Sequence, residues 1–312
     1  MKIFIVTEGG RNIGFGHITR CIALYQAFKK EKIDVEIVAN GDETIDFLLK
    51  RIKHKRFNWL RNKKNIYKQL KNADIGVIDS YLADIDFYKR VSEIVRMPVY
   101  IDDYNRLNYP KGIVVNPSIY GDKLNYPKRN GVTYLLGKDY IILRKEFWNV
   151  PKKKISKEIK NILITFGGMD YQEITKKLAN YLKNKFGFNS HIVNPFKKLT
   201  VKSMLNLMLK TDICISGGGQ TTYELARVGV PTIGICFAKN QRFNLKYGEK
   251  AGYLKFLGWF NGKSLFEKIE KMIRVLNYYK RLKMGRSGEK NIDKKGAERI
   301  TEIVKKLWKN YC

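Results

Sequence analysis

The chain of 312 residues has few of the features that mark secreted, membrane-spanning or metal-binding proteins. Its first residues lack the apolar core of about 7–15 residues and the cleavage site of a signal peptide. No segment approaches the run of roughly 20 apolar residues that a membrane helix requires. The four cysteines, Cys21, Cys214, Cys236 and Cys312, are scattered without C-x-x-C or any other metal spacing. We therefore expect a cytoplasmic protein with reduced thiols, no metal site and no stable membrane insertion.

Acidic residues are also scarce, with 29 Asp and Glu against 61 Lys and Arg, so that the formal net charge is +32. A basic field attracts phosphate groups. The lysines are spread along the chain and form no single tract, and no RNA-binding signature accompanies them. The charge therefore indicates either a lysine-rich surface or an anionic small substrate, and we expect no nucleic-acid partner.

Apolar, β-branched runs alternate with segments of helical period along the whole chain, which predicts an α/β fold with parallel sheets. A polar, charged stretch at 151–160 begins with proline and is typical of a linker. The strand-and-helix pattern restarts after it. We therefore predict two Rossmann-like domains, residues 1–150 and 151–312, with the last helix able to pack back on the first domain.

The expected elements can be placed by residue number. In the first domain we expect a helix at 16–32 and strands at 2–7, 34–39, 75–79, 99–103, 112–116 and 133–137. In the second we expect strands at 161–168, 191–196, 212–219 and 231–237, and helices at 221–229, 264–283 and 297–309. Ligands bind beyond the carboxyl ends of parallel strands, so the glycine-rich turns are expected to face one central cleft between the domains.

The most specific local pattern is "SGGGQTTYELARVGVPTIGI" at 216–235. Three glycines after a strand let the backbone approach a ligand, and the N–H groups and dipole of the following helix favour a diphosphate. Glu224 lies in the first turn of that helix, where it could bind a ribose diol or only complement the dipole. The pattern is neither a dinucleotide fingerprint nor a P-loop, and a tight connection is the alternative.

Other polar residues follow strands at the expected cleft. "FGGMD" at 166–170 is a second glycine pair, whose Asp170 could simply cap a helix. "FAKNQRFN" at 237–244 brings amides that suit a uracil or sugar edge, or only a polar loop. In the first domain, four polar residues lie at the ends of strands: Asp79, Tyr81, Asp102 and Asp103. We expect each of them either to contact substrate or only to hydrogen-bond its own loop.

His17, one of only three histidines, opens a helix in "IGFGHITRC" at 13–21. The positive end of a helix disfavours an imidazolium, and a neutral imidazole can accept a proton as a general base. Gly14 and Gly16 leave space for a bulky substrate beside it. The alternative is a histidine that caps the turn or fills a small gap.

These motifs together resemble those of the PseG/SpsG family, the UDP-sugar hydrolases of pseudaminic-acid synthesis and their spore-coat relatives. "IGFGHITRCIALYQAF" resembles the family's N-terminal signature, and "LLGKDYIILRKEFW" at 135–148 resembles its G-x-x-Y-x-x-L-R-x-E-F segment. "FGGMD" matches its G-G-x-D turn, and "GGGQTTYELARVGVP" its nucleotide half. The similarity covers nearly the whole chain and implies the GT-B fold, which the murein glycosyltransferase shares.

The resemblance implies hydrolysis of UDP-2,4-diacetamido-2,4,6-trideoxy-β-L-altropyranose to free sugar and UDP, with neither metal nor cofactor, in pseudaminic-type acid or surface polysaccharide synthesis. His17 would activate water, and Tyr81 would assist in the sugar pocket. We expect a monomer. The substrate-binding set would be Gly14, Gly16, Arg20, Asp79, Tyr81, Asp103, Gly168, Gly218, Gly219, Thr222, Glu224, Asn240 and Gln241.

One departure from the family and one rival function remain open. Glu8 stands where the family usually has aspartate, so the identity of the sugar is in doubt if that position touches sugar hydroxyls. A glycosyltransferase of the same architecture would share the donor site and differ only in its acceptor. The aromatic and basic segment 54–67 would then rest on a membrane surface; the alternative is a solvated helix and loop.

Overall fold

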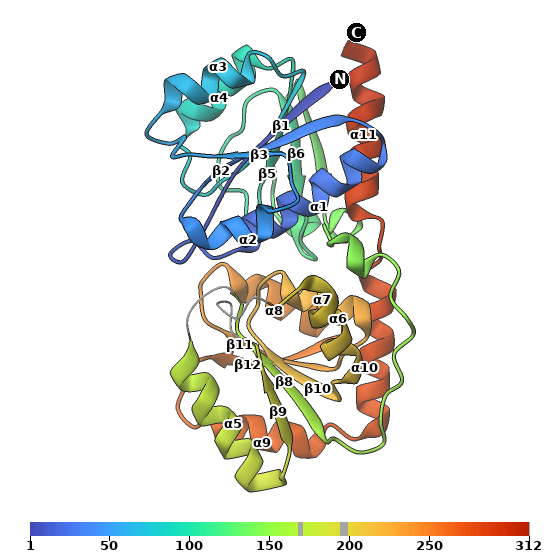
Figure 1. Cartoon of the computed structure of the whole chain (residues 1–312). Coiled ribbons are helices and arrows are strands. Elements are labelled where there is room, and N and C mark those ends of the chain that lie inside the picture. The colour runs from blue at the N-terminus through green and yellow to red at the C-terminus, as the bar shows by residue number, and fades with distance from the viewer. Residues whose placement is uncertain (168–170, 194–198, 312) are drawn as a thin grey trace. The chain divides into compact units, whose positions relative to one another are not determined.

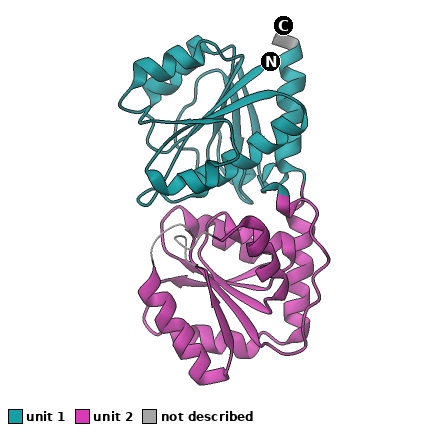
Figure 2. Ribbon diagram, in the orientation of Figure 1, with its two compact units in different colours: residues 1–145, 295–312 teal, residues 146–294 magenta. Residues whose placement is uncertain are grey.

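The computed structural model describes residues 1–167, 171–193 and 199–311. The chain forms two compact units (Figure 2). Unit 1 consists of residues 1–145 and 295–312, and unit 2 consists of residues 146–294. The helix at the C-terminus therefore belongs to the same unit as the N-terminal half of the chain.

Unit 1 contains a seven-stranded parallel sheet in the order β3-β2-β1-β4-β5-β6-β7. Strand β1 lies near the middle, where Val6 pairs with Val38 on one side and with Ile78 on the other. The central strands β4 and β5 are buried on both faces because helices cover both faces of the sheet. The strands are β1 Lys2–Gly9, β2 Asp34–Gly41, β3 His54–Arg56, β4 Ile75–Asp79, β5 Met97–Ile101, β6 Gly112–Asn116 and β7 Val132–Leu136.

The helices of unit 1 cover the two faces of this sheet (Figure 1). They are α1 Gly16–Lys30, α2 Asp46–Leu49, α3 Lys63–Leu70, α4 Ile85–Ile94 and α11 Gly296–Tyr311. Helix α11 packs beside α1, where Lys30 donates a hydrogen bond of 2.6 Å to Glu298. A side chain on Gly296 would place its Cβ 2.0 Å from the carbonyl oxygen of Ile141, so only glycine permits this approach.

The segment 54–67 is more than a solvated helix and loop. It supplies β3 at the edge of the sheet and the first turn of α3. Trp59 between them is fully buried, and its indole N–H donates a 2.9 Å hydrogen bond to the carbonyl of Thr7. Its ring packs against Phe87 of α4. The aromatic residue belongs to the core because the chain turns back under the sheet there.

Unit 2 contains a five-stranded parallel sheet in the order β12-β11-β10-β8-β9. Its strands are β8 Asn161–Thr165, β9 Asn189–Ile192, β10 Ile213–Ser216, β11 Thr232–Cys236 and β12 Leu254–Trp259. Its helices are α5 Gln172–Phe186, α6 Val201–Lys210, α7 Thr221–Val228, α8 Gln241–Lys250, α9 Leu265–Val275 and α10 Tyr278–Asn291. Isoleucines of the three central strands meet apolar side chains of α5 and α9 in one core.

The single helix expected at 264–283 is wrong, because α9 ends at Val275 and α10 begins at Tyr278. Asn277 between them is extended, and its side chain caps α10 by accepting the backbone N–H of Lys280 at 3.0 Å. The expected strand at 191–196 is observed as β9 and starts two residues earlier, while residues 194–196 lie outside the described residues. Across the part of the chain that is described, every helix is too short or too polar to cross a bilayer.

Candidate active site

The candidate site of unit 1 lies where β1 and β4 are neighbours in the sheet. From β1 the chain passes through α1 to β2 on one side, and from β4 it passes through α4 to β5 on the other. Such a topological switch point opens a crevice at the carboxyl ends of the strands. His17 at the start of α1 and Asp79 at the end of β4 both lie there.

His17 and Asp79 form a short, buried hydrogen bond. Nδ1 of His17 lies 2.6 Å from Oδ1 of Asp79, and the two residues are 6% and 0% exposed. Burial alone would raise the pKa of Asp79, but the charges of Arg20 and His17 and their hydrogen bonds outweigh it and hold the pKa well below its usual range. Nη2 of Arg20 also lies 3.1 Å from Nδ1, but the contact with the carboxylate is shorter and an ionised carboxylate can only accept, so we assign the proton to Nδ1. In the neutral imidazole, Nε2 is then the nitrogen that accepts a proton.

Arg20 binds both carboxylates of the site. Its Nε and Nη2 donate to the two oxygens of Asp79, each at 2.6 Å. Its Nη1 donates to the two oxygens of Asp103 at 2.7 and 2.9 Å. The hydroxyl of Tyr81 also donates to Asp103, and the ring of Tyr81 packs edge-on against His17 with centroids 4.3 Å apart. Four of the predicted residues thus surround His17.

Glu8 holds the turn that carries Tyr81. Its side chain is 0% exposed, and it accepts hydrogen bonds from the Ser80 hydroxyl at 2.5 Å and from the Tyr81 backbone N–H at 2.7 Å. The Leu82 N–H lies 3.2 Å from the same carboxylate. Its contacts are therefore with the protein turn, and through them Glu8 holds the backbone of Tyr81 in place.

The two neighbouring aspartates after β5 have different partners. Asp103 joins the site through Arg20, as predicted for a residue at a strand end. Asp102 is 1% exposed and bonds its own surroundings, accepting from the Tyr126 hydroxyl at 2.6 Å and from the Arg106 N–H at 3.2 Å. The contacts of Asp102 therefore match the alternative in which an aspartate at a strand end only bonds its own loop.

The two glycines next to His17 leave open space. Gly14 has φ +84°, a left-handed conformation that favours glycine, and its N–H donates to the carbonyl of Gly10 at 2.7 Å. A Cβ added at Gly14 or at Gly16 would meet no atom within 4 Å. The backbone at both glycines is therefore uncrowded.

The glycine turn of unit 2 also lies at a switch point, between β8 and β10. A Cβ on Gly218 would lie 2.7 Å from Cβ and 2.8 Å from the carbonyl oxygen of Gln241, whereas a Cβ on Gly219 would meet nothing within 4 Å. Oε1 of Gln241 accepts from the N–H groups of Gly218 at 3.2 Å and Phe237 at 3.1 Å. Gln241 therefore joins the ends of β10 and β11 and shapes the turn.

Asn244 and Thr222 fix the other side of this turn. Nδ2 of Asn244 donates to the carbonyl of Gly218 at 2.7 Å and to the hydroxyl of Thr222 at 2.9 Å. That hydroxyl donates in turn to the carbonyl of Gly219 at 2.7 Å. Thr222 thus acts on the turn through its backbone carbonyls.

The remaining predicted residues differ in exposure. Glu224 in α7 is 2% exposed, while Asn240 at the start of α8 is exposed. Gly168 lies outside the described residues. The structure therefore brings together one group of predicted residues in unit 1 and a second group in unit 2.

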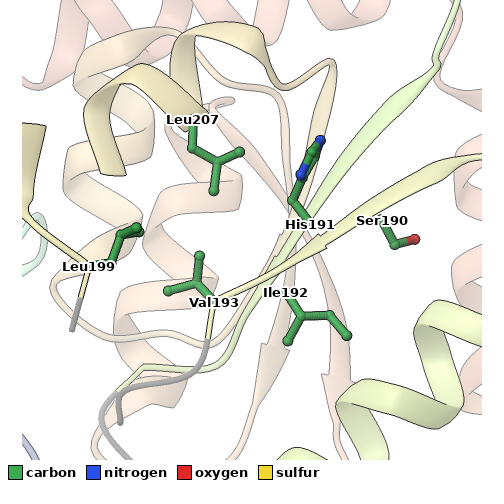
Figure 3. Close-up of a pocket in the computed structure, with 6 residues that line it drawn as sticks. All are labelled: Ser190, His191, Ile192, Val193, Leu199 and Leu207. Atoms are coloured by element: carbon green, nitrogen blue, oxygen red, sulfur yellow. The ribbon is translucent and has the colours of Figure 1, made fainter. Parts of the chain in front are cut away.

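A separate pocket of about 250 Å³ lies at the edge of unit 2 (Figure 3). Its lining comes from β9, from α6 and from their neighbours, with Ser190, His191, Ile192, Val193, Leu199 and Leu207 around it. It contains none of the predicted site residues. Within the described ranges no three His, Cys, Asp or Glu side chains gather where they could hold a metal ion.

Three residues of these sites have contacts that the sequence did not predict. Cys21 donates from Sγ to Oδ2 of Asp79 at 3.4 Å. Cys21 and Arg20 follow His17 by four and three residues, so all three lie on one face of the helix. This spacing is the sequence signal from which the contact of Cys21 with the site could have been predicted. The roles of Glu8 and Asn244 had no local signal, because their partners lie 72 and 26 residues away.

The chain is similar to several known proteins. The model of the glycosyltransferase family 28 C-terminal domain matches residues 144–300, half of the chain. The spore coat polysaccharide biosynthesis protein SpsG of Bacillus subtilis is 23% identical, with 99% of both chains covered. A Helicobacter pylori protein named pseudaminic acid cytidylyltransferase and UDP-2,4-diacetamido-2,4,6-trideoxy-β-L-altropyranose hydrolase is 26% identical over 82% of this chain and 48% of its own.

Among solved structures, MurG of Acinetobacter baumannii superposes with a TM-score of 0.68 at 13% identity, covering 98% of this chain and 100% of that one. This likeness confirms the predicted GT-B fold. The chain spans about half the length of two of the curated relatives that it matches.

Proposed function

The chain belongs to the PseG/SpsG family and contains a glycosyltransferase family 28 C-terminal domain, and from this premise we propose that it is a nucleotide-sugar hydrolase. The substrate we propose is a UDP-linked 2,4-diacetamido-2,4,6-trideoxy sugar, because the Helicobacter pylori relative is named for that hydrolysis. The pathway would be nonulosonic acid or surface polysaccharide synthesis. The observation that carries the proposal is the 2.6 Å hydrogen bond from Nδ1 of His17 to a buried, ionised Asp79.

His17 acts as the general base in this proposal. Its Nε2 takes a proton from water while the water oxygen bonds to the anomeric carbon. The bond from that carbon to the phosphate oxygen breaks, and its electron pair leaves with UDP. The imidazolium that forms is stabilised by Asp79, and its proton is then released to solvent. The chemistry needs a ring nitrogen with a free lone pair, and the hydrogen bond of Nδ1 to Asp79 leaves Nε2 as that nitrogen in the neutral imidazole.

Unit 2 binds the UDP leaving group in this proposal. The Gly218–Gly219 turn leads into α7, whose N-terminal N–H groups favour a diphosphate. Gly219 has open space where a Cβ would lie, so that backbone is accessible to a ligand on this unit. Backbone donors at the diphosphate would stabilise the charge that develops as UDP leaves.

The test is UDP release from a panel of UDP- and CMP-sugars. We expect release from the 2,4-diacetamido UDP-sugar without an acceptor. His17→Asn should abolish turnover with an unchanged Kd for UDP, whereas the control His191→Asn, at an exposed position in unit 2, should behave as wild type. No UDP release from any 2,4-diacetamido nucleotide sugar would refute the substrate, and near-normal kcat in His17→Asn would remove His17 from the chemistry.

A glycosyltransferase is the second candidate, and one observation favours it. Leu82, Tyr104 and Phe47 follow β4, β5 and β2 at the same edge as His17 and are 55%, 40% and 37% exposed. Apolar side chains beside a site suit an acceptor with an apolar carrier, although they also suit the methyl groups of a diacetamido, deoxy sugar. UDP release that requires an added acceptor would identify a transferase.

A further inference from the structure

Hydrogen bonds and one aromatic contact join five side chains around His17 in a closed ring. His17 donates to Asp79, Arg20 donates to Asp79 and to Asp103, and Tyr81 donates to Asp103. The ring closes where Tyr81 packs edge-on against the imidazole. The members come from α1, from the end of β4 and from the loop after β5. Only Arg20 contacts both carboxylates.

We propose that Arg20 is the positioning residue of this site, which fixes the reacting nitrogen of His17 through Asp79 and the place of Tyr81 through Asp103. This inference rests on the proposed function for its kinetic readout, but its structural claim concerns residues of unit 1 alone. Three observations support it. They are the shape of the guanidinium, the burial of the carboxylates, and the contact of Asp103 with both Arg20 and Tyr81.

The guanidinium matches its two acceptors in shape. It is planar, and its Nε and Nη2 along one edge meet the two oxygens of Asp79, while Nη1 alone meets both oxygens of Asp103. A lysine ammonium is a point charge and cannot hold two carboxylates in one plane. The position therefore requires arginine for its geometry as well as for its charge.

Because the site is buried, the pairing of Arg20 with the two aspartates determines whether Asp79 stays ionised. The side chains of Arg20 and Asp79 are 8% and 0% exposed, and that of Asp103 is 16% exposed. Burial alone would favour the neutral carboxylic acid of Asp79, and the positive charge of Arg20 contributes strongly to the lowered pKa of that group. Without Arg20 the anion that keeps the proton on Nδ1 of His17 would lose its main partner.

Arg20 also acts on Tyr81 without touching it. Asp103 accepts from both Arg20 and the Tyr81 hydroxyl, so the place of that carboxylate sets where the tyrosine hydroxyl lies. The backbone N–H of Tyr81 is held independently by Glu8 at 2.7 Å. The ring against His17 is therefore fixed at both of its ends, by Glu8 at the backbone and by the Arg20–Asp103 pair at the hydroxyl.

The principal test is Arg20→Met, with Arg20→Lys as the conservative variant. We expect kcat to fall on the order of 100-fold while the Kd for UDP stays unchanged, because misplacing a base costs about this much. Arg20→Lys should remain strongly impaired. The matched control is Arg90→Met in the same unit, where an exposed arginine donates to Glu93 at 2.7 Å. Wild-type kcat in Arg20→Met would overturn the proposal.

Nitrogen-15 NMR of the imidazoles gives a readout that does not depend on activity. The chain has three histidines, so assignment through His54→Asn and His191→Asn is direct. We expect neutral His17 to be protonated at Nδ1 in the wild type and to show a mixture of tautomers in Arg20→Met. If the wild type releases no UDP, the proposed function fails, while the tautomer still tests the positioning role. An unchanged Nδ1–H tautomer in folded Arg20→Met would overturn that role.

Asp103→Asn tests the second half of the ring if Arg20→Met does not fold. It keeps Asp79, so the Nδ1–H tautomer should persist. We expect kcat to fall roughly tenfold, because the tyrosine hydroxyl and Arg20 lose a charged acceptor. A wild-type kcat in Asp103→Asn would refute the extension of the ring to Asp103 and Tyr81.

Discussion

Gly218 and Gly219 are adjacent in the sequence, but the structure assigns them different constraints. Replacing Gly218 with alanine would place a Cβ 2.7 Å from Cβ of Gln241 and 2.8 Å from both its carbonyl oxygen and Cγ of Leu245. The same change at Gly219 meets no atom within 4 Å. Neither residue has a positive φ, so the comparison isolates crowding from backbone strain.

The expected cost of Gly218→Ala follows from these contacts. Two of the atoms belong to the backbone and the first side-chain carbon of Gln241, so no rotation of a flexible side chain relieves the overlap. Overpacking of this kind lowers the free energy of unfolding by about 1–3 kcal/mol. Movement of Gln241 would also break its hydrogen bonds from Gly218 and Phe237. For a unit of this size, Tm falls by roughly 2–4 °C per kcal/mol.

The assay combines thermal unfolding with UDP titration on the two variants. Gly218→Ala should lower Tm and weaken UDP binding together. Gly219→Ala should leave Tm within the error of the wild type, and it should weaken UDP binding if the diphosphate occupies the open space beside that residue. The pair therefore separates the shape of the turn from contact with the ligand.

Two results would refute the reasoning. A wild-type Tm for Gly218→Ala would show that the turn relaxes without cost. Unchanged UDP affinity for both variants would show that the turn does not bind the diphosphate, and the nucleotide site proposed for unit 2 would have to be abandoned.

Three further variants test separate parts of the molecule. Glu224→Ala should weaken UDP binding by about 1–3 kcal/mol if its carboxylate holds the ribose, and unchanged affinity would leave it a helix-end charge. Glu8→Gln should lower the free energy of unfolding by about 1–3 kcal/mol and reduce turnover, because an amide cannot accept from both Ser80 and Tyr81; denaturant unfolding and kcat together check this. Burial lowers the pKa of Lys153 to about 8 from 10.5, with Asp212 opposing part of the effect. Between these values the unfolded chain binds more protons, so the wild type should gain stability as pH rises from 8 to 10.5. Lys153→Met should lack that gain, and equal pH slopes in denaturant unfolding would contradict the assignment.

The local parts of the fold could be predicted from the sequence. Runs such as residues 75–79 and 112–116 read as buried strands, and β4 and β6 have these bounds. A hydrophobic pattern depends on residues that are close in the sequence, so it can be recognised without knowledge of the tertiary structure. The same reasoning failed at 264–283, where the cap by Asn277 ends one helix and starts another within an apolar pattern that continues.

Edge elements were harder to predict than central ones. Strand β3, "HKR", is short and charged because it lies at the edge of its sheet, and β12 is half-exposed at the edge of the other. Their sequences carry no continuous apolar run, since one side of each pairs with no further strand. Trp59 could not be placed from its basic neighbours, because its burial depends on the path of the chain under β1.

For the candidate site, too, the local features could be predicted from the sequence and the contacts between distant residues could not. The sequence by itself placed His17 at a helix start beside two glycines and placed aspartates at strand ends, because both features are local. Only the tertiary structure decided that Asp79 and Asp103, 59 and 83 residues from Arg20, share one guanidinium, and that Asp102 does not. The physical reason is that partner choice depends on strand order: β4 lies beside β1 and β5 lies beside β4, and no local pattern in the chain records which strands will be neighbours.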